Sequence, residues 1–84
     1  MTKNPIPQKP DDAPQKGEVY RHYKGDKYRV TGLALNSTDD TWMVLYEPMY
    51  ENAATEFFTR PLKEWREFVE WEGSRVERFV LVKE

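Results

Sequence analysis

Short runs of apolar and β-branched residues, separated by turn residues, make up most of the chain from Gly17 onward. Two of these runs, residues 19–24 and 27–35, lie on either side of Gly25-Asp26. A short glycine-containing turn between two such runs is typical of a β-hairpin. The pattern therefore predicts a pair of antiparallel strands at the start of the folded region.

In the second run of this hairpin, residues 27–35, polar and apolar residues alternate cleanly only at the start. With a period of two, one face would carry Tyr28, Val30, Gly32 and Ala34, and the other would carry Arg29, Thr31, Leu33 and Leu35. The apolar character of the later positions predicts a part that is buried on both sides or bent. Gly32 in mid-strand indicates a bulge or a tight barrel corner.

Two further strands are predicted in the middle of the chain. Residues 36–41 have the composition of a turn. Residues 42–46 form the most apolar run and predict a central strand that ends at Pro48. After a loop, residues 55–59 predict another short strand.

A short helix or 3-10 turn is expected after Arg60-Pro61. Proline is well tolerated in the first helical turn, and Thr59 is placed to cap it. Apolar residues then fall on one helical face, at Leu62, Trp65 and Val69. Residues 68–82 fit both a period of 2 and a period of 3.6, so a last strand pair and a helix–turn–strand both remain open.

About five short strands with one short helix predict a mostly β fold, a small antiparallel SH3-like barrel over residues 17–84. Large aromatic side chains are expected to fill its core, namely Trp42, Tyr46, Phe57 or Phe58, Trp65 and Phe79. Residues 1–16 contain four prolines and little apolar surface. They predict a flexible proline-rich arm, because burial cannot offset their ordering entropy.

Composition restricts the chemistry further. The 84 residues allow one domain, and the chain contains no cysteine and a single histidine. Disulfides, thiolate metal sites and a cysteine nucleophile are thereby excluded. The first residues lack the apolar run of a signal peptide, and no later run is long enough for a membrane helix. We expect a monomeric cytoplasmic protein with no membrane association and no cofactor.

Charge is distributed unevenly although the net charge is only −2. Residues 17–35 carry four basic and two acidic groups, whereas residues 36–59 carry five acidic groups and no basic one. This asymmetry could orient a charged partner, or it could reflect two solvated loops of opposite sign. Interleaved tyrosine, lysine and arginine over residues 20–30 suit RNA or single-stranded DNA. The pI near 5.5 disfavours that reading.

His22 is the one candidate acid–base group in the useful pH range. Its basic neighbours Arg21 and Lys24 favour the neutral imidazole, and in a strand Arg21 and Tyr23 point to the opposite face. One histidine without cysteine does not provide a metal site, and Asp39-Asp40 lacks the pattern of a calcium loop. A structural histidine is therefore favoured over a catalytic one.

Several short motifs together resemble a known family. They are YRHYKG at residues 20–25, Tyr28, Gly32, Ala34, Ser37-Thr38, residues 44–46, Tyr50, the RPL at residues 60–62 and Arg78-Phe79. In this order and spacing they resemble the small bacterial family known as domain of unknown function 1653, over residues 17–79. The resemblance implies a compact SH3-like β-barrel of bacterial origin and carries no established activity.

This sequence departs from the family pattern at two positions. Asn36 stands where the family typically has a histidine before the serine of its second turn, and Trp65 stands where a phenylalanine often follows the RPL. If the second histidine took part in chemistry, this protein has lost it.

The sequence thus favours a non-enzymatic module that binds a protein or peptide through a face including the 20–30 hairpin. The candidate partner-binding residues are Arg21, His22, Tyr23, Lys24, Asn36 and Arg60. Two alternatives remain: RNA or single-stranded DNA binding through the same hairpin, and a small-molecule binder or small enzyme that uses His22, Asn36 and Arg60. Arg60, at a strand-to-helix junction, could instead fork across a carboxylate or carbonyls and fix the corner.

Overall fold

The computed structural model of the chain describes residues 8–83, and these form seven strands and one short helix. In chain order the elements are β1 (Val19–His22), β2 (Lys27–Asn36), β3 (Thr41–Pro48), β4 (Phe58–Pro61), α1 (Leu62–Trp65), β5 (Phe68–Trp71), β6 (Ser74–Glu77) and β7 (Phe79–Leu81). The predicted mostly β fold is therefore confirmed. No helix within this part of the chain is long and apolar enough to cross a membrane.

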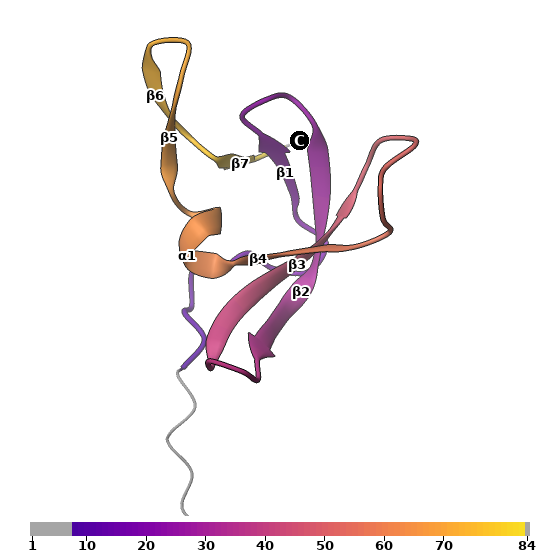
Figure 1. Cartoon of the computed structure of the whole chain (residues 1–84), viewed down its shortest axis with the longest axis vertical. Helices are drawn as coiled ribbons and strands as arrows, with labels where there is room; N and C mark the ends of the chain where they lie inside the picture. The colour runs from indigo at the N-terminus through magenta and orange to yellow at the C-terminus, as the bar shows by residue number, and fades with distance from the viewer. Residues whose placement is uncertain (1–7, 84) are drawn as a thin grey trace, which may run out of the picture.

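The main sheet is antiparallel and has the strand order β4-β3-β2-β1-β7, while β5 and β6 form a separate two-stranded sheet. Three loops project from one end of the main sheet, which are the β1–β2 turn, the β3–β4 loop and the β5–β6 hairpin (Figure 1). The β2–β3 turn lies at the other end (Figure 1). Within residues 8–83 no strand pairing joins β4 to β7, so the sheet is open. The expected small antiparallel SH3-like barrel is therefore corrected to an open five-stranded sheet with a separate two-stranded one.

A bulge in β2 reverses the predicted assignment of its later side chains. Val30 pairs with Tyr46 and Gly32 pairs with Leu45, which leaves Thr31 as the extra residue. Because one extra residue moves all following side chains to the other face, Leu33 joins Val30 on the core side. The expected grouping of Gly32 and Ala34 with Tyr28 was therefore wrong, although Gly32 did indicate the bulge.

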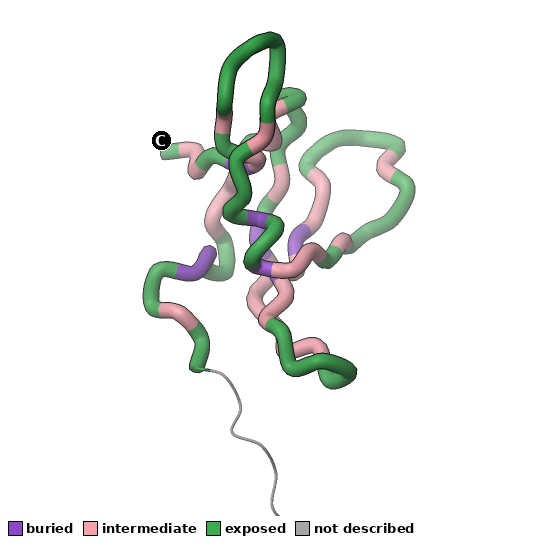
Figure 2. Tube along the Cα trace, turned by 60° about the vertical axis from the view of Figure 1, so that its left-hand side comes forward, coloured by how far each residue is buried: buried purple, intermediate pink, exposed green. Residues whose placement is uncertain are grey.

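The core lies between one face of the main sheet and α1. Its buried hydrophobic residues are Ala13, Val30, Val44, Tyr46, Leu62, Trp65 and Phe79. Buried positions gather where α1 meets the strands, and the projecting hairpin tips are exposed (Figure 2). Among the expected core aromatics, Trp42 and Phe58 are partly buried against this cluster, whereas Phe57 is 51% exposed.

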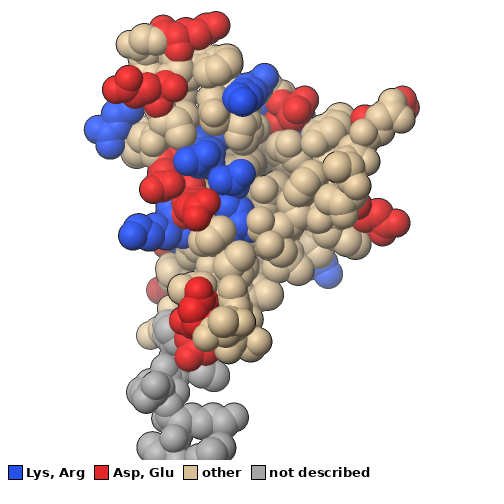
Figure 3. All heavy atoms as spheres, viewed as in Figure 1, with Lys and Arg blue, Asp and Glu red and all other residues tan. Residues whose placement is uncertain are grey.

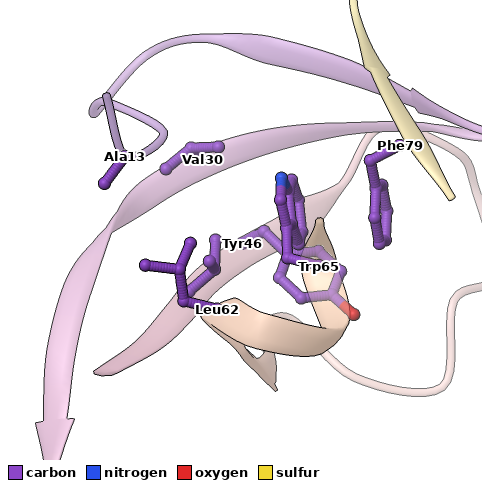
Figure 4. Packing of buried hydrophobic residues seen from close by; sticks show 7 residues of the cluster. Ala13, Val30, Tyr46, Leu62, Trp65 and Phe79 are labelled. Carbon is purple, nitrogen blue, oxygen red and sulfur yellow. The ribbon is translucent and has the colours of Figure 1, made fainter. Parts of the chain in front are cut away.

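The rings of Trp65 and Phe79 are the centre of this core. Their centroids are 3.7 Å apart and the planes are nearly parallel, at 6°. Trp65 comes from α1 and Phe79 from β7, and the two rings lie side by side (Figure 4). Tyr46 meets the indole edge-on at 4.9 Å and so ties β3 to the same stack. The predicted core role of all three aromatics is confirmed.

The segment after Trp65 forms strands, which decides between the strand pair and the helix–turn–strand that the sequence left open. The helix ends at Trp65, and Val69 lies in β5, where it pairs with Val76 of β6. Residues 68–82 therefore form a strand pair followed by β7. The expected cap is also absent, because Thr59 lies within β4 and the N-cap position before Leu62 is Pro61, with no side-chain cap hydrogen bond.

The predicted flexible arm over residues 1–16 falls partly outside the described residues, which begin at Gln8. Its described part contacts the domain. Ala13 is 7% exposed and belongs to the core, and Asp12 pairs with Arg66 at 2.9 Å. Gly17 then donates its backbone N–H to the carbonyl of Val30 at 2.8 Å, which leads the chain into β1.

Candidate functional site

The strand pairings divide the 20–30 hairpin into two faces. His22 ends β1 and pairs with Phe79 of β7, so its side chain lies on the core side of the sheet. Arg21 points to the opposite face and is exposed, as the alternation predicted. Tyr23 and Lys24 follow in the β1–β2 turn, close to the end of the strand that carries His22.

Aromatic rings and cations surround His22. Its ring centroid lies 4.4 Å from that of Tyr23 and 5.1 Å from that of Phe79. The backbone N–H of Lys24 donates to the imidazole Nδ1 at 3.2 Å. Burial lowers the pKa of His22 below its ordinary value of 6.5, and the charges of Arg60, Lys24 and Arg78 lower it further. This direction agrees with the predicted preference for the neutral imidazole, and Lys24 contributes as predicted, whereas Arg60 and Arg78 act in place of Arg21.

This lowered pKa predicts a loss of stability in mild acid. The unfolded chain has an ordinary histidine pKa, so it takes up a proton before the folded chain does. The free energy of unfolding should therefore fall as pH drops through about 6.5, and this contribution should be complete above that pH. Urea unfolding at pH 7.5 and 5.5 measures the effect.

The matched control for this pH effect is His22→Asn, because the asparagine Oδ1 can still accept the Lys24 N–H bond. His22 is the chain's only histidine, so the variant should show a shallower dependence on pH in this window. An equal dependence in both proteins would show that other groups cause the acid sensitivity.

The charges of two arginines act on His22, one from Arg60 on β4 and one from Arg78, the residue between β6 and β7. Arg60, on the core side of β4, lies over the Phe79 ring at 5.8 Å and pairs with Glu64 at 3.5 Å. Arg78 donates from Nε to the backbone carbonyl of Glu64 at 3.1 Å and pairs with Glu67 at 3.4 Å. The fork that the sequence proposed for Arg60 is therefore made by Arg78. The Nε of Arg60 is buried and has no hydrogen-bond partner within the described residues.

Two exposed aromatic side chains, Trp71 and Tyr50, extend the cluster of rings around His22 through Tyr23 and Tyr28. Trp71, on β5, is 38% exposed and meets Tyr23 edge-on at 5.2 Å. On the other side, the Tyr50 hydroxyl lies 3.3 Å from that of Tyr28. Lys and Arg side chains gather between the β5–β6 hairpin and the main sheet, with acidic side chains beside them (Figure 3). We call this surface the His22 face; it consists of His22, Tyr23, Lys24, Arg60, Trp71 and Arg78.

Asn36 lies far from the His22 face. It pairs with Thr41 at the β2–β3 turn, at the opposite end of β2 from the β1–β2 turn. By strand rise this separation is roughly 30 Å. Its Oδ1 accepts the backbone N–H of Thr38 at 2.9 Å and so shapes its own turn. The structure therefore does not bring His22, Asn36 and Arg60 into one site.

Sequence reasoning missed two members of the His22 face. Arg78 belongs to the Arg78-Phe79 pair, and since Phe79 was expected in the core, the preceding arginine could have been placed at its rim. Trp71 gave no comparable signal, because the sequence of residues 68–82 fits both a strand pair and a helix, and the two place this side chain on different faces. Four of the six predicted partner residues, which are His22, Tyr23, Lys24 and Arg60, do come together.

The chemistry available on this face is recognition by charge and aromatic contact. Within residues 8–83, no group of three or more potential ligands is placed to hold a metal ion. His22 has one nitrogen engaged by a backbone N–H, and its neighbours on the face are cations and aromatic rings. Such a set of groups favours an anionic ligand with apolar parts.

Comparison with known proteins identifies the family. A search among curated proteins found no match. Among solved structures, the crystal structure of a protein belonging to DUF1653 from Bordetella bronchiseptica matches with a TM-score of 0.75 and 39% sequence identity. The match covers 86% of this chain and 88% of that one. The model of the family described as "Protein of unknown function (DUF1653)" matches residues 18–81, and this chain belongs to that family.

Proposed function

We propose that the protein is a non-enzymatic binding module and that its His22 face binds acidic peptide segments. The observation that carries this proposal is the placing of cations around the His22 ring: Arg60 lies over the Phe79 ring that His22 meets edge-on at 5.1 Å, and Lys24 follows in the adjacent turn, where its N–H donates to the imidazole. Lys24 lies over the Tyr23 ring at 5.8 Å, and Trp71 meets that ring edge-on, so the two aromatic side chains offer apolar contact area beside the cation. A peptide carboxylate could be held by Arg60, whose guanidinium makes only one long ion pair within the described residues.

A single carboxylate suits this face better than a chain of phosphates. Glu64 and Glu67 lie among the cations and pair with Arg60 and Arg78. A nucleic acid that tracks across the face would meet these carboxylates, and nucleic-acid affinity relies on many phosphate contacts at once. A peptide can place one acidic residue on the cations and apolar residues on the exposed aromatics. RNA or single-stranded DNA binding is therefore the competing outcome of the test.

The test is an NMR titration of the full-length, ¹⁵N-labelled protein with a short synthetic peptide of alternating glutamate and leucine residues. We expect the largest shifts at Tyr23, Lys24, Arg60 and Trp71. Lys24→Glu should weaken binding about tenfold, equivalent to about 1.4 kcal/mol. Arg21→Glu is the matched control, because Arg21 lies on the other face of β1, and it should leave the affinity nearly unchanged.

Three results would contradict the proposal. The first is tighter binding of oligo-uridylate than of the acidic peptide at the same salt concentration. The second is an equal affinity for a peptide in which lysine replaces every glutamate. The third is an absence of shifts on the His22 face at millimolar peptide.

A further inference from the structure

A second surface feature lies beside α1 on the side of the β2–β3 turn, and it borders the His22 face at Arg60, because Glu64 in its lining pairs with Arg60 at 3.5 Å. A groove of about 660 Å³ lies between the β2–β3 turn and the segment that leads from β4 through α1. Trp42, Pro61 and Leu62 supply its apolar lining. Leu62 is buried and Trp42 is partly buried against the core, so the apolar floor is continuous with the fold. This volume falls within the range of ligand-binding clefts.

Charged residues line the groove on two sides. Asp39 and Asp40 come from the β2–β3 turn, whereas Lys63, Glu64 and Arg66 come from the helical side, which therefore carries both signs of charge. Arg66 already pairs with Asp12 at 2.9 Å, which partly neutralises the helical side. The acidic turn is therefore the less compensated side, and charge complementarity favours a ligand with a positive group next to it.

The acidic side is held in a defined conformation. The Asp39 Oδ1 accepts two hydrogen bonds from Thr41, one from the backbone N–H at 3.1 Å and one from the hydroxyl at 2.7 Å. Asp40 adopts a left-handed conformation with φ of 57°, and its N–H donates to the carbonyl of Asn36 at 2.7 Å. A turn fixed in this way presents its carboxylates without a large ordering cost on binding.

From this arrangement we infer that the groove binds an extended peptide of a partner protein, with a basic residue next to Asp39 and Asp40 and proline or aliphatic residues against Trp42 and Pro61. Extended proline-containing segments suit aromatic-lined grooves, because they lose little conformational freedom on binding. The acidic side disfavours a nucleic acid. The inference does not depend on the proposed function, since the two surfaces favour opposite charges and the acidic groups Asp39 and Asp40 lie at the far end of β2 from His22.

Two charge changes on opposite sides of the groove test this inference in the full-length protein. The probe is a short synthetic peptide that has arginines at one end, followed by alternating proline and leucine. Asp40→Asn removes one charge and keeps a side chain that tolerates the left-handed conformation, so it should weaken binding about three- to tenfold. Lys63→Glu adds an acidic group on the other side and should strengthen binding by a similar factor.

A control variant and NMR shift mapping show whether the peptide binds in this groove. Glu56→Gln changes an exposed carboxylate in the β3–β4 loop and should leave the affinity unchanged. NMR shifts should cluster at Asp40, Trp42, Leu62 and Lys63 and leave His22, Tyr23, Lys24 and Trp71 unperturbed.

Several outcomes would overturn the inference. One is an unchanged affinity in both Asp40→Asn and Lys63→Glu, and another is shifts outside the groove. Equal binding of a peptide with glutamate in place of arginine, or of oligo-uridylate, would show a different preference. Equal binding of argininamide alone would identify a small-molecule site instead.

Discussion

Replacing Trp65 by alanine should lower the free energy of unfolding by about 3–5 kcal/mol. Trp65 is 3% exposed and stacks on Phe79 with 3.7 Å between the ring centroids. Tyr46 and Tyr20 meet the same indole edge-on, at 4.9 and 5.2 Å. Truncation would leave a cavity between α1 and the sheet that side chains from several strands would have to fill. A chain of this size has only about 5 kcal/mol of stability, so most of it would be lost.

Urea unfolding followed by far-ultraviolet circular dichroism measures this loss, and Trp71→Ala is the matched control. Trp71 is 38% exposed on the β5–β6 hairpin and contacts Tyr23 at its edge. Its truncation should cost less than about 1 kcal/mol. If the two tryptophan variants lose similar stability, the Trp65–Phe79 stack is not the centre of the core.

A second variant at Trp65 separates the ring from its polar group. The indole Nε1 is buried and has no hydrogen-bond partner within the described residues. Such a group is costly to bury, so phenylalanine, which keeps an aromatic ring and lacks the N–H, should lose much less stability than alanine does. A loss as large as that of Trp65→Ala would instead show that the full indole volume is required.

The sequence located most strands because their signals are local. The β1–β2 hairpin follows from two apolar runs around Gly25-Asp26, and β3 follows from an apolar run that stops at Pro48. The faces of β2 could not be assigned in the same way. They depend on the extra residue Thr31, which exists only relative to the pairing with β3. Closure of the sheet is likewise a property of pairing between β4 and β7, which no local pattern records.

The candidate site was predictable where its residues come from one hairpin. His22, Tyr23 and Lys24 are consecutive, so their proximity follows from the sequence. Arg60 was predicted as a binding residue on its own, and the sequence did not show that it lies near His22. Its position over Phe79 depends on the pairing of β4 with β3. Asn36 was included through its place in the family pattern. A ten-residue strand between the two turns carries it to the other end of the sheet.

Replacing Arg78 by methionine is expected to lower the free energy of unfolding by about 2 kcal/mol. The guanidinium Nε donates to the carbonyl of Glu64 at the end of α1, and the same side chain pairs with Glu67. These bonds hold the end of α1 against the start of β7, and methionine keeps much of the apolar volume but makes neither bond. Arg29→Met is the matched control, because Arg29 makes an exposed pair with Glu47 at 3.2 Å and should cost less than about 1 kcal/mol.

Two further variants, Glu67→Gln and Arg78→Lys, separate the contribution of the ion pair with Glu67 from that of the hydrogen bond to the Glu64 carbonyl. Glu67→Gln weakens only the exposed ion pair, so it should cost well below 1 kcal/mol. If it reproduces the full loss of Arg78→Met, the carbonyl bond contributes little. Arg78→Lys keeps the positive charge but cannot match the planar fork, so its loss of stability should be about half that of Arg78→Met. Because the charge near His22 is retained, the affinity for the acidic peptide should change less than it does in Lys24→Glu, which separates the structural role of Arg78 from its contribution to the His22 face.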